Sequence, residues 1–173
     1  YKKLAVDLDI APNEAKEMLK EFRQKVPFMQ GMLEAVMNRA NQIGSIRTYL
    51  GRRCKFDMWE PSWYDPGVFH KAVSHDEALT KWGGSIKRAG TYKALNRLIQ
   101  GTAADQTKKA MVDLYEQDGI IPHIQVHDEL NISIENEEQA KRIINVMEHC
   151  IKLNVPSKVD CEIADNWGDA KGS

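Results

Sequence analysis

The apolar residues in the first quarter of the chain recur at helical spacing. They predict a helix over residues 12–41, with Pro12 in its first turn, where a missing backbone N–H breaks no hydrogen bond. Pro27 is expected to break or kink this run, because its ring removes a helical hydrogen bond. The helix then continues until Gly44, a residue suited to a C-terminal cap.

The next part of the chain lacks a long periodic run. Residues 46–56 predict a short hairpin, and the prolines and glycine between Trp59 and Phe69 predict a loop. Ser74 and Glu77 have the spacing of a capping box, in which each side chain accepts a hydrogen bond from the backbone N–H of the other residue. This pattern predicts a short helix that begins behind Ser74.

The longest helical pattern covers residues 85–117 and ends just before Gly119. The period then changes to the alternation that is typical of strands. Residues 124–126 and 130–134 alternate apolar and polar side chains, so they predict two strands joined by a tight turn at residues 127–129.

The last part of the chain predicts one more helix and one more strand. Asn136 is expected to cap the helix, and residues 158–163 are expected to return as a strand. The order of elements therefore predicts an α+β fold, in which helices pack on a small antiparallel sheet that carries an acidic hairpin.

The composition is that of an ordinary globular domain, with 173 residues, 42% hydrophobic and 28% charged. No apolar run approaches the roughly 20 residues that span a bilayer, and no signal-peptide pattern follows Tyr1. We therefore expect a soluble, cytoplasmic protein with no membrane partner. Cys54, Cys150 and Cys161 are widely spaced and contain no CxxC pair, so they predict free thiols, buried or half-buried, rather than a zinc site or disulfides.

The net charge of −1 does not indicate a nucleic-acid partner, but the local charge is more informative. Between Lys81 and Lys109 the only acidic residue is Asp105. The cations of this basic run are Lys81, Lys87, Arg88, Lys93, Arg97, Lys108 and Lys109. Such a run indicates either a solvated helix face or a surface that follows phosphate groups, and the pattern leaves both open.

The tripeptide His-Asp-Glu occurs twice. At residues 75–77 it follows Ser74, where helix capping and the helix dipole explain the acidic side chains. At residues 127–129 it lies between two alternating strands, so no helix terminus explains it. Metal-assisted phosphoryl transfer needs rigidly placed carboxylates, and Mg²⁺ typically binds one or two of them together with phosphate oxygens and water. Asp128 and Glu129 are therefore candidate metal ligands, with an ordinary polar turn as the alternative.

Three segments, in this order along the chain, carry a resemblance to a known family. They are Thr48-Tyr49-Leu50-Gly51-Arg52-Arg53, residues 94–105, and Ile124-Gln125-Val126-His127-Asp128-Glu129-Leu130. The first is similar to the T-x-x-G-R-R segment of the fingers, the second to the helix that lies against the primer–template minor groove, and the third to motif C of the family A DNA polymerases. This family comprises bacterial polymerase I and T7-type phage enzymes, and the phage branch is the more similar one. Asn166-Trp167 resembles the tail that closes the palm.

The resemblance implies a role for each matched residue. Asp128 matches the metal ligand of motif C, Glu129 its auxiliary neighbour, and His127 the residue near the primer terminus. Asn96 and Gln100 match the pair that contacts the minor groove. Amide side chains can meet the acceptors that all base pairs present there, and residues four apart lie on one helix face.

The chain also departs from the family pattern. The family commonly has an arginine where this chain has Tyr92, and Lys93 and Arg88 are the candidates to replace its charge. Tyr92, Lys93 and Arg97 are therefore counted with the DNA-binding residues. Residues 55–90 form a variant connection that differs from polymerase I.

The resemblance finally implies what this sequence lacks: motif A, with the other metal-binding aspartate, and the fingers helix that grips the incoming nucleotide. Asp128 and Glu129 alone do not clamp two Mg²⁺ ions, so we expect the chain to be inactive by itself. Its expected partners are primer–template DNA, deoxynucleoside triphosphates and an N-terminal half that carries motif A, docked on a large apolar interface. Residues 1–90 would then derive from the fingers and residues 91–173 from the palm, in a bacterial host cell if the protein is phage-encoded.

Two other functions stay open. A non-catalytic DNA-binding or processivity module would use the basic run and the minor-groove helix, and Asp128→Ala or Mg²⁺ would not affect its duplex binding. A metal-dependent nuclease or phosphatase would need more ligands around Asp128, and His123 is the only nearby candidate.

Overall fold

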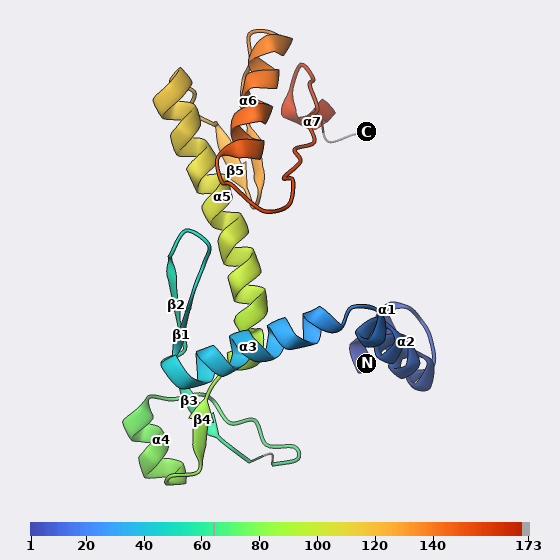
Figure 1. Cartoon of the computed structure of the whole chain (residues 1–173), viewed down its shortest axis with the longest axis vertical. Coiled ribbons are helices and arrows are strands. Elements are labelled where there is room, and N and C mark those ends of the chain that lie inside the picture. The colour runs from blue at the N-terminus through green and yellow to red at the C-terminus, as the bar shows by residue number, and fades with distance from the viewer. Residues whose placement is uncertain (64, 171–173) are drawn as a thin grey trace. The chain divides into compact units, whose positions relative to one another are not determined.

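The computed structural model describes residues 1–63 and 65–170 and has the α+β composition that the sequence predicts (Figure 1). Its contacts divide the chain into two compact units. The first unit comprises Tyr1–Arg47 and Arg53–Leu98, and the second comprises Thr48–Arg52 and Ile99–Ser173.

The described residues form short strands and longer helices. The helices are α1 (Lys2–Asp7), α2 (Pro12–Lys25), α3 (Pro27–Ile43), α4 (His75–Trp82), the 3₁₀-helix η1 (Thr91–Lys93), α5 (Ala94–Asp118), α6 (Glu137–His149) and α7 (Trp167–Ala170). The strands are β1 (Ser45–Arg47), β2 (Arg53–Lys55), β3 (Trp59–Pro61), β4 (Ile86–Arg88), β5 (Ile124–Val126) and β6 (Glu129–Asn131). None of the helices within these described ranges is both long and apolar enough to cross a membrane.

The predicted break at Pro27 is confirmed. Helix α2 ends before Val26, whose φ of −128° is not helical, and α3 begins at Pro27. Gly44 ends α3 with a φ of 72°, the left-handed conformation that glycine adopts without a steric penalty. The Arg88 guanidinium fills the space beside it, donating to the Asn41 and Phe56 carbonyl oxygens at 3.1 and 2.9 Å. Helix α1 was not predicted, because its six residues are too few for a periodic pattern.

Strands β1 and β2 pair antiparallel, which confirms the predicted hairpin. The hairpin packs on α3 and the start of α5 around one small buried cluster. This cluster contains Ala40, Ile46, Phe56 and Ala94, with Val36, Cys54 and Leu98 against it. The core of the first unit thus lies where the hairpin, α3 and the start of α5 meet.

Two sequence predictions in this unit are wrong. Residues 59–61 are not part of a loop but form β3, which pairs antiparallel with β4. The long helix does not begin at residue 85, because β4 occupies residues 86–88 and Gly90 then turns the chain with a φ of 71°. A strand that pairs with a segment 25 residues away leaves no local pattern, and Pro61 stands at the strand end, where its missing N–H is tolerated.

The second unit follows the predicted order more closely. Gly119 ends α5 with a φ of 67°, and β5 and β6 form the predicted hairpin, which pairs Val126 with Glu129. The predicted strand at residues 158–163 is wrong, since Val159 gives its backbone N–H to Glu148 Oε1 at 3.1 Å instead of to a strand. Among the described residues the strands form three separate two-stranded sheets rather than one.

Helices α5 and α6 form the core of the second unit together with the chain that follows α6. Leu114 is fully buried, and Ala110 and Ile143 are nearly so. Gln106 on α5 donates to Ser157 Oγ at 2.7 Å, which ties α5 to the segment behind α6. The predicted cap is confirmed, because Asn136 Oδ1 accepts from the backbone N–H of Gln139 at 2.9 Å.

The three cysteines are free, as predicted. Cys54 and Cys150 are half-buried, which confirms that part of the prediction, whereas Cys161 is exposed, which contradicts it. Burial raises the pKa of the Cys150 thiol, and the neighbouring Asp113 carboxylate raises it further.

A raised pKa leaves less thiolate at a given pH, and the thiolate is the reactive form. We therefore expect Cys150, which is half-buried and has a raised thiol pKa, to react with iodoacetamide at pH 8 more slowly than exposed Cys161. Peptide mapping of partly alkylated protein measures both rates in one sample. Equal rates in the folded protein, with both thiols equally reactive after denaturation, would contradict the burial of Cys150.

Candidate active site

The acidic hairpin ends in a turn of two residues, His127 and Asp128, rather than three. Glu129 already belongs to β6 and pairs with Val126. His127 has a φ of 54°, and the common two-residue hairpin loops require a positive φ at their first residue. Among non-glycine residues histidine is one of the more tolerated there. The backbone therefore fixes the place of Asp128 at the tip of the hairpin.

The neighbours of the turn support it through polar contacts. Gln125 Nε2 donates to the His127 carbonyl oxygen, and Asn131 Nδ2 donates to Glu129 Oε1 at 3.2 Å. Asp128 is exposed and has no hydrogen bond or ion pair with another described residue. Its carboxylate is therefore available to a ligand.

Two exposed carboxylates on consecutive residues fit one part of a magnesium site. Mg²⁺ is commonly bound through one or two protein carboxylates, and substrate phosphates and water complete its ligands. Within residues 1–63 and 65–170 no group of three histidine, cysteine or acidic side chains is gathered as a metal site would need. The donor set is therefore suited to Mg²⁺ but incomplete for two ions.

His123 does not add to this site. Its Nε2 lies 2.9 Å from Ser133 Oγ, and its backbone N–H donates to the Asn131 carbonyl oxygen at 2.9 Å. Both contacts place it at the end of the hairpin opposite the turn. The hypothesis of a metal-dependent nuclease or phosphatase needed His123 near Asp128 as a further metal ligand, and the structure does not place it there.

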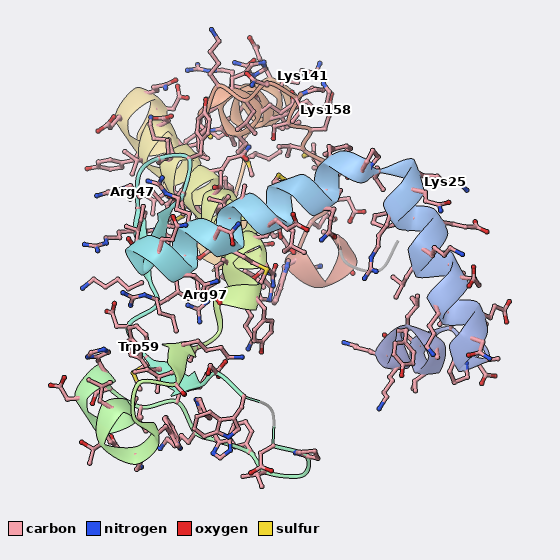
Figure 2. The ribbon with its side chains drawn as sticks, turned by 60° about the horizontal axis from the view of Figure 1, so that its bottom comes forward. Lys25, Arg47, Trp59, Arg97, Lys141 and Lys158 are labelled. Carbon is pink, nitrogen blue, oxygen red and sulfur yellow. The ribbon has the colours of Figure 1, made fainter. Side chains whose placement is uncertain are left out.

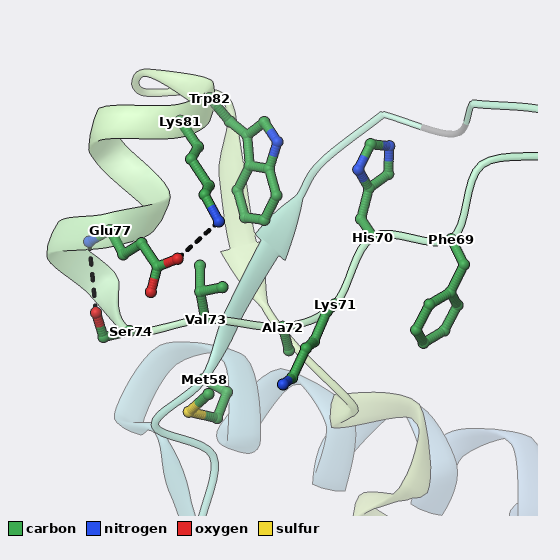
Figure 3. Close-up of a pocket in the computed structure, with 10 residues that line it drawn as sticks. All are labelled: Met58, Phe69, His70, Lys71, Ala72, Val73, Ser74, Glu77, Lys81 and Trp82. Carbon is green, nitrogen blue, oxygen red and sulfur yellow. Dashed lines mark hydrogen bonds and ion pairs between the residues drawn. The ribbon is translucent and has the colours of Figure 1, made fainter.

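The first His-Asp-Glu copy is structural, as predicted. Ser74 Oγ accepts from the Glu77 backbone N–H at 3.4 Å, and Glu77 Oε1 lies 2.7 Å from Lys81 Nζ (Figure 3). The Asp76 side chain is 99% exposed in the first turn of α4. Capping and the helix dipole explain these residues fully.

An open hollow of about 670 Å³ lies beside this helix. Figure 3 shows Lys81, Trp82 and His70 around it, with Phe69 on the loop that leads to it. Among the described residues that line it, the only carboxylate belongs to Glu77, which is already paired with Lys81. The hollow therefore offers no second metal site.

The side chains predicted to face DNA lie on η1 and on α5. Asn96 and Gln100 are exposed on α5, and their spacing of four places them on one helix face. Tyr92 is 64% exposed on η1, and Lys93 Nζ lies 5.5 Å from the centroid of its ring. These four side chains are accessible to a ligand.

Arg97, labelled in Figure 2, also has a packing role. Its guanidinium carbon lies 4.9 Å from the centroid of the Phe56 ring, and Nη1 donates to the Lys55 carbonyl oxygen at 3.4 Å. These contacts use part of the hydrogen-bonding capacity of the Arg97 guanidinium and pack it against the hairpin that follows α3.

Most of the basic run has partners inside the protein. Ion pairs join Lys81 to Glu77, Lys87 to Glu60 and Lys109 to Asp113. The hydrogen bonds of Arg88 and Arg97 to carbonyl oxygens occupy two more cations. The basic run as a whole therefore resembles a solvated surface with internal ion pairs more than a surface that binds successive phosphate groups.

The sequence analysis missed one network in the second unit. The hairpin tip, defined as residues Thr48–Arg52, holds α5 through Asp105. Thr48 Oγ1 donates to Asp105 Oδ2 at 2.5 Å, and Arg52 Nε donates to Asp105 Oδ1 at 2.6 Å. The signal that could have revealed it is a lone acid in a basic run on a helix, because a buried carboxylate must find partners.

Gly101 makes the close approach of the hairpin tip possible. A Cβ at this position would lie 2.8 Å from Thr48 Cγ2. The Thr48 side chain cannot easily move away, because its hydroxyl donates a hydrogen bond to Asp105. We expect Gly101→Ala to destabilise the protein by about 1–2 kcal/mol, because overpacking outweighs the better helix propensity of alanine. The matched change Gly31→Ala in α3, where no atom lies within 4 Å of the new Cβ, should stabilise by about 0.5–1 kcal/mol.

Urea unfolding of the two variants measures this difference. Stabilisation of both variants to the same extent would show that the hairpin tip does not contact α5 at Gly101.

The comparisons with known proteins agree on one family. The family model described as DNA polymerase family A matches residues 1–169. The chain is 38% identical over 164 residues to a DNA-directed DNA polymerase of Pseudomonas phage M6, covering 95% of this chain and 21% of the relative. It is 31% identical over 176 residues to DNA polymerase I of Bacillus caldotenax, covering 97% of this chain and 18% of the relative.

A solved structure gives the same result. The POL domain of Pol1 from M. smegmatis, in complex with DNA primer-template and dNTP, matches 88% of this chain and 25% of its own chain, with 27% identity and a TM-score of 0.62. The chain thus spans about a fifth of the length of the curated relatives that it matches.

Proposed function

Because the chain belongs to DNA polymerase family A, we propose that it forms the C-terminal part of a DNA-directed DNA polymerase. The assembled polymerase, meaning this chain together with the half that carries motif A, joined or separate, adds deoxynucleotides to a primer 3′ end in DNA replication. The observation that supports the proposal is the two-residue turn that exposes Asp128 beside Glu129, in the segment that resembles motif C.

In this proposal Asp128 and Glu129 hold Mg²⁺, which supplies a lowered pKa for the primer 3′-hydroxyl and neutralises phosphate charge in a two-metal phosphoryl transfer. The contribution of the chain is rigid placement. The paired strands on both sides of the turn fix the Asp128 carboxylate before substrate binds, so no reorganisation is needed during the reaction. His127, next to Asp128, faces the primer terminus.

Asn96 and Gln100 hold the primer–template duplex from its minor groove, with Lys93, Arg97 and Tyr92 alongside. The amide N–H groups of Asn96 and Gln100 donate to purine N3 and pyrimidine O2 atoms, acceptors that every correct base pair presents in similar positions. The contact therefore tests the shape of a pair without reading its sequence.

Each of these amides can be tested by truncation. We expect Asn96→Ala and Gln100→Ala to weaken primer–template binding about tenfold each, the effect of one lost hydrogen bond to a buried acceptor, for any duplex sequence. Gln117→Ala, an exposed glutamine near the end of the same helix, is the matched control and should bind normally. Fluorescence anisotropy of a labelled duplex measures the affinities, and equal affinity in all three variants would exclude the minor-groove role.

The N-terminal half is the partner proposed for the apolar surface of the first helices. Val6, Phe22 and Phe28, on α1, α2 and α3, are 79%, 53% and 67% exposed, which is unusual for such large apolar side chains. Residues 1–90 are assigned to the fingers and residues 91–173 to the palm, and the polymerase acts in the cytoplasm, of a bacterial host if phage-encoded.

The alternative function is a non-catalytic DNA-binding or processivity module, which would use the exposed side chains of Lys93, Asn96 and Gln100. Single-nucleotide incorporation by the assembled polymerase distinguishes the two. With Mg²⁺ we expect incorporation, and with EDTA we expect no incorporation but retained duplex binding. Duplex binding without incorporation under either condition would support the module instead.

A further inference from the structure

The hairpin tip binds one turn of α5 through two hydrogen bonds, whose acceptors belong to residues on the same side of the helix. Arg52 Nη2 donates to the Gly101 carbonyl oxygen at 2.7 Å, and Arg52 Nε donates to Asp105 Oδ1 at 2.6 Å. Gly101 and Asp105 are four residues apart and therefore share a helix face. Both hydrogen bonds are donated from one edge of the planar guanidinium. They therefore restrain this helical turn in its rotation about the helix axis and in its position along that axis.

The remaining contacts make the grip specific. Asp105 is 6% exposed, and its second oxygen accepts from Thr48 Oγ1 at 2.5 Å. Thr48 Oγ1 also accepts from the Arg52 backbone N–H at 3.0 Å, which closes a ring of three residues. A buried carboxylate is costly unless it is paired, and apolar packing would hold the two segments together without it. The ring therefore favours one geometry over other packed arrangements.

Gln100 precedes Gly101 directly and is exposed. Successive helical residues are about 100° apart around the axis, so the gripped side of the turn lies next to the side that presents Gln100. A grip on the Gly101 carbonyl oxygen thus holds the backbone from which the Gln100 side chain projects.

We propose that Thr48 and Arg52 are positioning residues that act through Asp105 and Gly101 to hold Gln100 for its contact with the minor groove at the primer terminus; this inference rests on the proposed function. A mispaired terminus displaces the minor-groove acceptors. A Gln100 amide held in one place is therefore sensitive to the mispair, whereas a loosely held amide follows the displaced acceptor.

The test compares extension of matched and mismatched primer termini by the assembled polymerase. Thr48→Val removes the hydroxyl at nearly constant shape, and we expect it to lower the matched-to-mismatched ratio about tenfold, the size of one weakened hydrogen bond. Thr48→Ser keeps the hydroxyl and should restore the ratio to within about twofold of the wild-type value. In a Gln100→Ala background Thr48→Val should have no further effect on the ratio, since it acts through Gln100.

Each other outcome has a definite meaning. An unchanged ratio in folded Thr48→Val, or an equal loss with and without Gln100, overturns the positioning role, because a structural defect would lower both rates together. If Thr48→Val does not fold, Arg52→Lys, which keeps the charge but loses the planar fork, is tested in the same way. Failure of the wild-type assembled polymerase to extend any primer, or no effect of Gln100→Ala on the ratio, would instead contradict the proposed function.

Discussion

Asp128→Ala in the assembled polymerase is expected to lower the rate of nucleotide incorporation by about 10³-fold or more. A metal ion contributes several kcal/mol of charge stabilisation to phosphoryl transfer, and about 4 kcal/mol corresponds to a factor of about 10³. Asp128 is exposed at the tip of the hairpin and makes no hydrogen bond or ion pair with another described residue, so its removal should not disturb folding. Single-turnover incorporation under saturating DNA and nucleotide measures the effect.

The chain contains its own matched control for this experiment. Asp76 stands in the same tripeptide, His-Asp-Glu, but its side chain is 99% exposed in the first turn of α4. Asp76→Ala should leave the incorporation rate within about twofold of wild type, since exposed substitutions away from a site usually have small effects. Comparable losses in the two variants would mean that neither aspartate binds the metal and that both act on folding.

The second large effect is the dependence of activity on the proposed N-terminal half. We expect the purified chain alone to incorporate no nucleotide, because Asp128 and Glu129 do not form a complete ligand set for two ions. Addition of the N-terminal half that carries motif A should produce incorporation, and omission of Mg²⁺ should remove it. A steady-state primer-extension assay over a titration of the added half measures the stoichiometry.

The exposed apolar residues of α1–α3 provide a control for this assembly. Phe28→Asp, at a side chain that is 67% exposed, should weaken association by about tenfold or more, because it places a charge in an apolar interface.

Activity of the chain alone at the level of the mixture would contradict the need for motif A.

The sequence predicted the elements whose signals are local. The breaks at Pro27 and Gly44 and the cap at Asn136 depend on residues within one helical turn, and they are found where predicted. Strand β4 and the mistaken strand at residues 158–163 depend on whether a distant partner is present, which no local pattern reveals.

The candidate site divides in the same way. Alternating strands around residues 127–129 predicted the hairpin, and the structure shortens the turn to two residues, because Glu129 pairs with Val126. The second strand also ends at Asn131, so the strand predicted for residues 132–134 is wrong. The grip of Thr48 on Asp105 joins residues 57 positions apart and could not be predicted from spacing. The sequence offered only the indirect sign of one acid within a basic run.

The central claim is that Asp128 lies at a catalytic metal ion in the assembled polymerase. Replacing Mg²⁺ by Fe²⁺ in the presence of ascorbate and peroxide generates radicals that cleave the backbone next to the bound ion. We predict cleavage between residues 126 and 130 that Mg²⁺ suppresses and that Asp128→Ala abolishes. Cleavage at residues 75–77 instead, or none near Asp128 while incorporation proceeds, would contradict the account.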